Sequence, residues 1–213
     1  MVYLITNGET NASTTPASEE FSNVLRLVDA AVSAQIDLIQ IREKRLSTKV
    51  LHQLSSSAAG ITRGSATKLL VNDRADVAAT AGADGVHLTS SSLPPDVIRL
   101  TFDAKFLIGV STHSFAEAAA ARRGGSDFIV FGPVFDTPAK RQYGDPLGLT
   151  ELRRVTSELA PFPVLALGGV TVDHVPDCID EGAAGIAAIR MLADPLQLAR
   201  VINKIRNRAD DSD

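Results

Sequence analysis

Residues 40–44 read Gln-Ile-Arg-Glu-Lys and carry side chains that could bind a polar ligand. They follow the apolar residues Leu38 and Ile39, as the end of a buried strand would. Because side chains alternate between the two faces of a strand, Gln40, Arg42 and Lys44 share one face with Leu38. Burying such a polar row costs desolvation energy unless a ligand meets it. The stretch therefore predicts either a ligand site at a strand end or an ordinary strand end with two solvated basic residues.

The surrounding chain alternates apolar runs of strand length with runs of helical periodicity. This alternation occurs eight times without a composition break or linker, which indicates a parallel sheet. The expected strands are residues 2–6, 38–42, 68–72, 86–88, 106–110, 128–132, 163–167 and 185–189.

Eight such units predict an α/β fold with a single (β/α)8 TIM barrel over residues 1–208. Residues 209–213 are expected to form a disordered acidic tail. An open doubly wound sheet is the alternative. It is disfavoured because the segment Asn7-Gly8-Glu9-Thr10 after the first strand lacks the G-x-G-x-x-G pattern.

Ligands of such barrels bind at the carboxyl ends of the strands, and polar residues gather at those ends here. The candidates are Gln40, Arg42, Lys44, Asn72, Asp73, His87, Ser111, His113, Thr137, Lys140, Gly168, Gly169, Ile189 and Arg190. Their convergence on one rim carries more weight than any single residue, and it predicts one site there.

Two loops could form a phosphate cradle. Gly168-Gly169 follows the seventh strand and Ile189-Arg190 the eighth, the usual location of a phosphate site in this fold. Glycines let backbone N–H groups approach an anion, and Arg190 could add positive charge. A plain turn containing two glycines is the alternative.

The segment 133–147 is longer than a typical connection between a strand and a helix. Its residues Thr137 and Lys140 fit a lid that closes over phosphates. A mobile insertion without such a role is the alternative.

Two further side chains have chemistry of their own. Asp73 could ligate Mg2+, which often takes one or two carboxylates together with substrate phosphate oxygens. It could equally cap a helix or pair with Arg74. His113 could carry a proton or be a polar residue in the turn before a helix that Ser114 caps.

Composition narrows the function classes. With 45% hydrophobic and 22% charged residues and a net charge of −4, the chain is typical of a globular protein without a nucleic-acid surface. Cys178 is the only cysteine, the first residues do not resemble a signal peptide, and no apolar run approaches membrane-spanning length. These features predict a cytoplasmic protein that binds neither nucleic acid nor a membrane. The sequence leaves open whether it forms a homo-oligomer.

The order of these motifs resembles the thiamine-phosphate synthase family and its relatives, the TenI-like thiazole tautomerases, over nearly the whole chain. The matching segments are 40–44, Val71-Asn72-Asp73, Gly85-Val86-His87-Leu88, 109–114, Phe131-Gly132-Pro133-Val134-Phe135 with Thr137 and Lys140, and 167–170. The resemblance implies a (β/α)8 barrel. It also implies a transferase that joins an aminopyrimidine methyl diphosphate to a thiazole phosphate and releases diphosphate.

The family pattern implies a role for each matching residue. Gln40, Arg42, Lys44 and Asn72 would surround the pyrimidine and its diphosphate. Ser111 and Lys140 would contact the diphosphate, with Thr137 near the thiazole phosphate. Gly169 and Ile189 would bind that phosphate through backbone N–H groups, beside Arg190.

The sequence departs from the synthase pattern at the metal site. Five residues after His87, where synthases usually have a second Mg2+ carboxylate, stands Ser92. Ala139 also replaces a hydroxyl residue that is often found two positions after Thr137. A Mg2+ site held by Asp73 would thus be weakened. Two alternatives follow: a tautomerase that uses His113 as acid and base, and a non-catalytic protein that binds thiazole or thiamine phosphate.

Overall fold

The computed structural model describes residues 1–137 and 145–210. In these ranges eight parallel strands close into a barrel in sequence order, with β1 paired to β8 through Tyr3 and Ala187. The strands are Val2–Ile5 (β1), Leu38–Ile41 (β2), Lys68–Asn72 (β3), Gly85–Leu88 (β4), Leu107–Thr112 (β5), Phe128–Phe131 (β6), Val164–Leu167 (β7) and Gly185–Ala188 (β8). The predicted (β/α)8 barrel is confirmed, and the doubly wound alternative is wrong.

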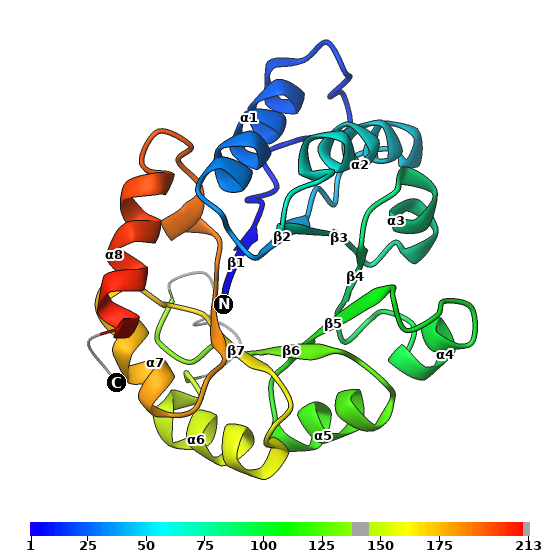
Figure 1. Cartoon of the computed structure of the whole chain (residues 1–213). Helices are drawn as coiled ribbons and strands as arrows, with labels where there is room; N and C mark the ends of the chain where they lie inside the picture. The colour runs from blue at the N-terminus through cyan, green and yellow to red at the C-terminus, as the bar shows by residue number, and fades with distance from the viewer. Residues whose placement is uncertain (138–144, 211–213) are drawn as a thin grey trace.

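Helices surround the barrel on its outside (Figure 1). They are Glu19–Ser33 (α1), Thr48–Thr62 (α2), Ala75–Ala81 (α3), Pro95–Arg99 (α4), Phe115–Arg123 (α5), Gly148–Leu159 (α6), Val175–Asp180 (α7) and Leu198–Asp210 (α8). Two single 3-10 turns, Val172–His174 (η2) and Arg190–Leu192 (η3), follow β7 and β8. Helix α4 is the shortest, and α5 beside it is rich in alanine, so this side of the outer ring is thinly filled.

The strands divide their side chains between two apolar layers. One layer fills the barrel and consists of Tyr3, Ile5, Leu38, Leu70, Phe128, Val130, Leu165 and Ala187. The other lies between the strands and the helices and includes Ile39 and Ile41. The alternation predicted for β2 is therefore confirmed, because Leu38 points inward and the two isoleucines point outward. Gln40 shares the inward face of Leu38 and is also buried.

Aspartates lock the amino-terminal ends of the strands. An aspartate precedes each of β2, β4 and β6, and its Oδ2 accepts the N–H of a residue on the preceding strand. These pairs are Asp37 with Val2 at 2.6 Å, Asp84 with Leu69 at 2.9 Å, and Asp127 with Ile108 at 2.6 Å. The repeated contact fixes the register at the barrel end opposite the predicted site, where a role in stability is expected.

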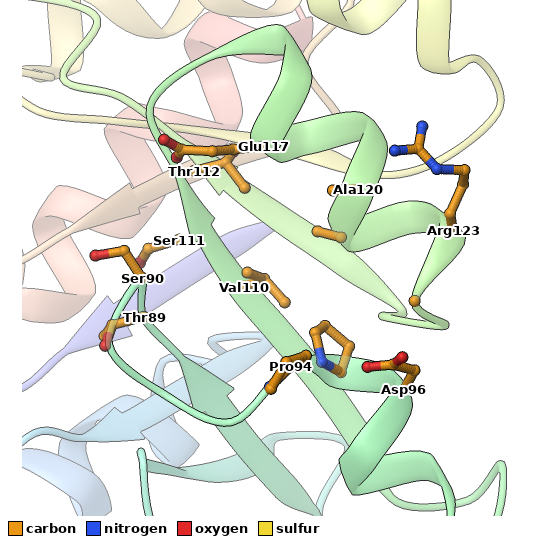
Figure 2. A pocket seen from close by; sticks show the side chains of 13 residues that line it. Thr89, Ser90, Pro94, Asp96, Val110, Ser111, Thr112, Glu117, Ala120 and Arg123 are labelled. Carbon is orange, nitrogen blue, oxygen red and sulfur yellow. The ribbon is translucent and has the colours of Figure 1, made fainter.

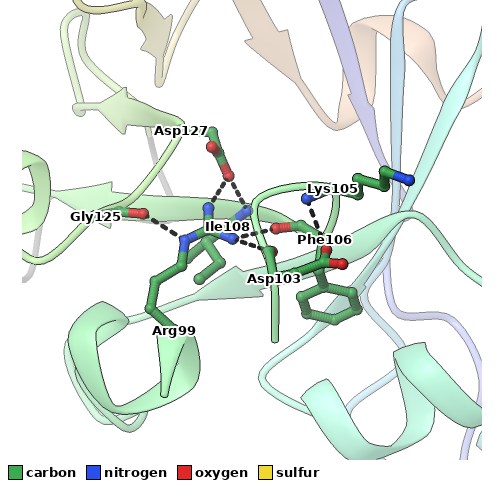
Figure 3. A network of polar contacts seen from close by, with 7 residues as sticks. All are labelled: Arg99, Asp103, Lys105, Phe106, Ile108, Gly125 and Asp127. Carbon is green, nitrogen blue, oxygen red and sulfur yellow. Dashed lines mark hydrogen bonds and ion pairs between the residues drawn. The ribbon is translucent and has the colours of Figure 1, made fainter. Parts of the chain in front are cut away.

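Arg99 extends the clamp at Asp127 (Figure 3). Its guanidinium pairs with the Asp127 carboxylate and donates hydrogen bonds to the carbonyls of Asp103, Phe106 and Gly125. One arginine thus ties α4 to the starts of β5 and β6. This compensates for the few packing contacts that a five-residue helix can make.

The last helix extends into the expected tail. Helix α8 continues to Asp210, so its backbone includes the first two residues of the expected tail, while residues 211–213 lie outside the described part. None of the helices in the described ranges has the length and apolar character needed to cross a bilayer.

Candidate active site

Gln40 and Asn72 meet inside the rim of the barrel. Gln40 is 1% exposed, and its Nε2 donates a hydrogen bond to Asn72 Oδ1 at 3.0 Å. Gln40 Oε1 is buried and has no hydrogen-bond partner among the described residues. A buried acceptor without a donor typically costs about 1–3 kcal/mol, so this oxygen indicates where a ligand N–H or O–H would bind.

A cavity of about 280 Å³ lies at the ends of β2, β3 and β4. It is lined on one side by Lys44, Asn72 and Asp73 and on the other by Thr89 and Ser91. Three of the predicted site residues, from two strands, therefore share one cavity. Lys44 is exposed at its edge.

Asp73 does not cap α3, but its charge contributes to the raised pKa of the neighbouring Arg74. The ion pair of Arg74 is with Asp76 at 2.6 Å, and α3 has no side-chain cap. The Asp73 backbone lies in the left-handed region with φ of 60°, and its N–H donates to the carbonyl of His87 at 2.8 Å. Within the described residues its carboxylate accepts no hydrogen bond, and no three acidic, histidine or cysteine side chains form a metal cluster. Asp73 thus offers one carboxylate that is not held by a hydrogen bond, beside the charge of Arg74.

Glu43 organises the loop before α1. It is 2% exposed, and its two carboxylate oxygens accept four hydrogen bonds. The donors are the Thr6 hydroxyl at 2.6 Å, the Gly8 N–H at 3.3 Å, and the Thr10 hydroxyl and N–H at 2.6 and 3.2 Å. Thr6 Oγ1 in turn accepts the N–H of Arg42 at 2.8 Å. Glu43 therefore couples the first loop to the backbone that carries Arg42.

The positive charge of Arg42 lies near the neutral ring of His87. Arg42 is half-buried, and its guanidinium makes no hydrogen bond with the described residues. His87 is 2% exposed, and burial, aided by the charge of Arg42, lowers its pKa to about 3. His87 is therefore an uncharged imidazole at neutral pH, with Arg42 available for an anion.

A buried chain of polar groups connects His87 to the rim. Its Nδ1 lies 3.2 Å from the hydroxyl of Tyr3, and its Nε2 lies 2.8 Å from Ser111 Oγ. Tyr3 is fully buried, and its burial raises the pKa of the phenol well above the ordinary value. Ser111 is half-buried on the inward face of β5. His87 was one of the candidates at the strand ends, but its contacts with Tyr3 and Ser111 were not predicted.

His113 bridges the ends of β5 and β6. The ring Nδ1 of His113 forms a hydrogen bond with the carbonyl of Gly132. The backbone N–H of His113 donates to Glu117 Oε2 at 2.7 Å. Ser114 caps α5 by accepting the N–H of Glu117 at 3.2 Å, as predicted. Since a carbonyl only accepts, Nδ1 carries the hydrogen and Nε2 of a neutral ring is left as the basic nitrogen.

The glycine pair forms a tight turn after β7. Gly168 and Gly169 have φ of 96° and 67°, and a Cβ on Gly169 would lie 2.6 Å from the carbonyl oxygen of Asp136. Glycine is thus needed where this turn packs against the loop after β6. Within the described residues the N–H groups of Gly169 and Ile189 donate no hydrogen bond, so they remain available to an anion. Arg190 is exposed at the start of η3.

The beginning of the segment 133–147 is fixed against the same turn. Phe135 stacks on His174, with ring centroids 3.9 Å apart, and His174 Nδ1 lies 3.1 Å from the Gly169 carbonyl. Thr137 is buried. His174 is half-buried. The predicted residues Lys140 and Ala139 lie outside the described part.

Known proteins match the chain over most of its length. The family model described as thiamine monophosphate synthase matches residues 2–192. The chain belongs to the thiamine monophosphate synthase family. It is 42% identical over 174 residues to a putative thiamine-phosphate synthase from Geobacter sulfurreducens, covering 81% of each chain. It is 35% identical over 182 residues to the thiamine-phosphate synthase of Methanoculleus marisnigri, covering 85% of this chain and 86% of that one.

A solved structure supports the same assignment. The thiamine phosphate pyrophosphorylase from Pyrococcus furiosus superposes with a TM-score of 0.81 at 26% identity, covering 99% of this chain and 96% of that one. As a member of the thiamine monophosphate synthase family, the chain places Gln40, Lys44, Asn72 and Asp73 at one rim of the barrel together with Arg42 and Ser111.

Ser92, which differs from the family pattern, has a local structural role. Its Oγ accepts the N–H of Thr89 at 2.7 Å and lies 3.1 Å from the Thr89 hydroxyl. It therefore closes the turn after β4, and Ser91, not Ser92, lines the cavity beside Asp73.

A larger cavity of about 650 Å³ lies outside the barrel between α4 and α5 (Figure 2). Val110 and Thr112, on the outward face of β5, line it together with Pro94 and Ala120. Ser111 is the one predicted site residue that borders it. Because Lys44, Asn72 and Asp73 line the smaller cavity, that cavity is part of the candidate active site of this thiamine monophosphate synthase family member.

Sequence reasoning missed three residues that shape the site: Glu43, Tyr3 and His174. Each looks ordinary in the sequence: an acid beside two bases, a strand aromatic and a helix-proximal histidine. The only available signal was that the buried stretch 40–44 contains an acid as well as the basic row.

Proposed function

We propose that the protein is a thiamine-phosphate synthase, a transferase that joins an aminopyrimidine methyl diphosphate to a thiazole phosphate. The bond between the methylene carbon and the diphosphate oxygen breaks, and diphosphate leaves with the electron pair. The thiazole nitrogen then supplies the pair for the new carbon–nitrogen bond. Small phosphorylated molecules are thus the partners of this site.

Gln40 and Asn72 bind the pyrimidine in this proposal. The unpartnered Gln40 Oε1 would accept a hydrogen bond from the exocyclic amine, while its Nε2 stays on Asn72. A buried oxygen without a donor is a binding group prepared before the ligand arrives, which lowers the cost of ordering the site.

Arg42, Lys44, Ser111 and Lys140 stabilise the leaving diphosphate. Charge grows on its oxygens as the bond breaks, so fixed cations and donors act most strongly in the transition state. His87 near Arg42 is uncharged, so the positive charge at this point comes from Arg42 and not from the imidazole. The segment 133–147 would exclude water from the electron-poor methylene carbon.

Asp73 is the proposed Mg2+ ligand. Its carboxylate lies at the smaller cavity and accepts no hydrogen bond from the described residues, which fits a cation held by one carboxylate and substrate phosphate oxygens. Mg2+ bound there would neutralise part of the diphosphate charge. With Ser92 committed to its turn, we expect the affinity for Mg2+ to be weak.

The thiazole phosphate would bind between the loops after β7 and β8. The N–H groups of Gly169 and Ile189 are the proposed donors, with Arg190 as a countercharge and Thr137 alongside. The firm packing of the Gly169 turn against Phe135 and His174 supports a rigid cradle.

The observation that carries the proposal is the buried, unpartnered Gln40 Oε1 at a rim shared with Lys44 and Asp73 in a chain of this family. The test is diphosphate release from both substrates across a Mg2+ titration. Release that requires both substrates and saturates at high Mg2+ is expected. No release at any Mg2+ concentration would remove the synthase.

A thiazole tautomerase is the second candidate, favoured by one observation. The hydrogen bond of His113 Nδ1 to Gly132 leaves Nε2 as a base at the rim. Isomerisation of a thiazole carboxylate phosphate by the wild type but not by His113→Ala would support it, and equal rates would exclude His113 as the proton carrier. If both assays fail while thiazole phosphate still binds in calorimetry, the protein is a binding protein.

A further inference from the structure

The hydroxyl of Tyr3 has a single hydrogen-bonding neighbour. It is fully buried inside the barrel and lies 3.2 Å from His87 Nδ1, and no other described residue offers it a donor or an acceptor. A phenol carries one hydrogen, which must find an acceptor when it is buried. The Tyr3 O–H can satisfy this need only by donating to Nδ1.

This direction fixes the tautomer of His87. If Nδ1 accepts from Tyr3, the single hydrogen of the neutral ring is on Nε2. The opposite tautomer and the doubly protonated ring would both direct an N–H at the Tyr3 oxygen and leave the phenol hydrogen buried without an acceptor. Both are therefore disfavoured by geometry alone.

Packing holds the ring in the plane that this arrangement needs. The His87 ring centroid lies 5.6 Å from that of Tyr3 and 6.2 Å from that of Phe128. Gly109 leaves space for it, because a Cβ there would lie 2.8 Å from His87 Nδ1 and 2.4 Å from the Phe128 ring. The imidazole therefore has little freedom to turn away from either partner.

The tautomer determines what Ser111 can offer a ligand. With the hydrogen on Nε2, His87 donates to Ser111 Oγ at 2.8 Å, and one serine lone pair is occupied. Ser111 then has no acceptor for its own hydrogen among the described residues, so the O–H is directed to the open rim. With the other tautomer, Ser111 would donate to Nε2 and present only lone pairs to an anion, which would repel it.

We infer that Tyr3 is a positioning residue that, through the tautomer of His87, makes the Ser111 hydroxyl a hydrogen-bond donor to an anionic ligand. This assignment rests on the proposed function only for the identity of that anion, the diphosphate group. Tyr3 itself does not touch the substrate. Its contribution reaches the reaction through two hydrogen bonds.

The tautomer can be measured without any substrate. Nitrogen-15 NMR of the histidine side chains in the wild type is expected to show a protonated Nε2 and an unprotonated Nδ1 for His87. The Tyr3→Phe variant keeps the ring packing and removes the hydroxyl, so the two tautomers should become mixed. A wild-type ring with its hydrogen on Nδ1, or on both nitrogens, would overturn the inference even if the synthase assay succeeds.

Kinetics test the link to Ser111. Tyr3→Phe is expected to lower kcat for diphosphate release about tenfold with little change in KM, because the lost donor acts on developing charge. In a Ser111→Ala background, the same change should cost nothing further. Independent, multiplicative losses would show that Tyr3 acts by another route.

A matched control lies next to Ser111 on β5. Thr112 has a buried hydroxyl with no described partner, on the outward face of the strand. Thr112→Val removes this hydroxyl and should change neither the His87 tautomer nor kcat. If the synthase assay fails altogether, calorimetry with inorganic diphosphate replaces it. Weaker binding by Tyr3→Phe that is absent in the Ser111→Ala background then supports the inference, and unchanged binding overturns it.

Discussion

Glu43 binds both polar groups of Thr10 through one carboxylate oxygen, which accepts hydrogen bonds from the Thr10 hydroxyl at 2.6 Å and from the Thr10 N–H at 3.2 Å. The other carboxylate oxygen accepts hydrogen bonds from the Thr6 hydroxyl and the Gly8 N–H. Glu43 stands between two basic residues, a pattern typical of a solvent-exposed acid, but it is the buried group that holds the loop after β1. The backbone of Arg42 depends on it through Thr6.

Glu43→Gln should loosen this loop. The amide nitrogen of glutamine cannot accept, so at least one oxygen's pair of donors is left unsatisfied in a buried position. We expect a loss of about 2–4 kcal/mol in the free energy of unfolding, measured by urea denaturation. Limited proteolysis within residues 7–18 should also become faster. Glu9→Gln, at an exposed site in the same loop, should stay within about 0.5 kcal/mol of wild type.

Gln40→Leu should separate binding from stability. Leucine removes the unpartnered Oε1 but also leaves Asn72 without its donor, so the free energy of unfolding should change by less than about 1 kcal/mol. The KM for the pyrimidine substrate should rise at least about tenfold, since a hydrogen bond to a buried group is lost. A KM equal to that of wild type would place the pyrimidine elsewhere.

Ser55→Ala is the matched control for this result. Ser55 Oγ is another buried atom for which the described part of the chain offers no partner, but it lies on α2, away from the rim. Its removal should leave KM unchanged and should not reduce stability. This contrast tests whether an unsatisfied buried group at the rim serves a ligand.

Ser92→Asp should increase the affinity for Mg2+, so that the enzyme is active at lower metal concentrations. An aspartate can still accept the Thr89 N–H, so the turn should survive while a second carboxylate joins Asp73 near the smaller cavity. Half-maximal activity should then need several-fold less Mg2+. Asp73→Asn should shift the titration the other way. An unchanged titration in both variants would mean that the metal is held by other groups.

Acid should destabilise the protein through His87. Its pKa is about 3 in the folded chain, against an ordinary value of 6.5, so between these values the unfolded chain binds a proton that the folded chain does not. The contribution of the uncharged His87 to the free energy of unfolding is therefore fully present above about pH 6.5. It falls by about 1.4 kcal/mol per pH unit as the pH decreases towards 3. Urea denaturation at a series of pH values measures the slope.

Arg42→Ala should make this slope smaller at its acid end. The charge of Arg42 is one cause of the lowered His87 pKa, so its removal lets the folded ring accept a proton at a higher pH. Arg45→Ala removes an exposed charge three residues away and should leave the slope unchanged. Identical slopes in all three proteins would contradict the proximity of Arg42 to His87.

The sequence alone determined the barrel and the rim at which the candidate site residues gather. Strict alternation of apolar runs admits few topologies, and parallel strands must end at one rim, so Gln40, Lys44, Asn72 and Asp73 had to converge there. The face of Gln40 also followed from the two-residue period of a strand. These are local or symmetric rules, which depend on spacing and not on particular contacts.

Only the tertiary structure decided which polar groups are satisfied. Glu43 faces the first loop, Tyr3 reaches His87 across the barrel, and Gln40 keeps one oxygen unpartnered, although nothing in their neighbours' sequence separates these outcomes. A hydrogen bond requires two groups within about 3 Å. Residues 84 positions apart, such as Tyr3 and His87, come that close only after the barrel has closed.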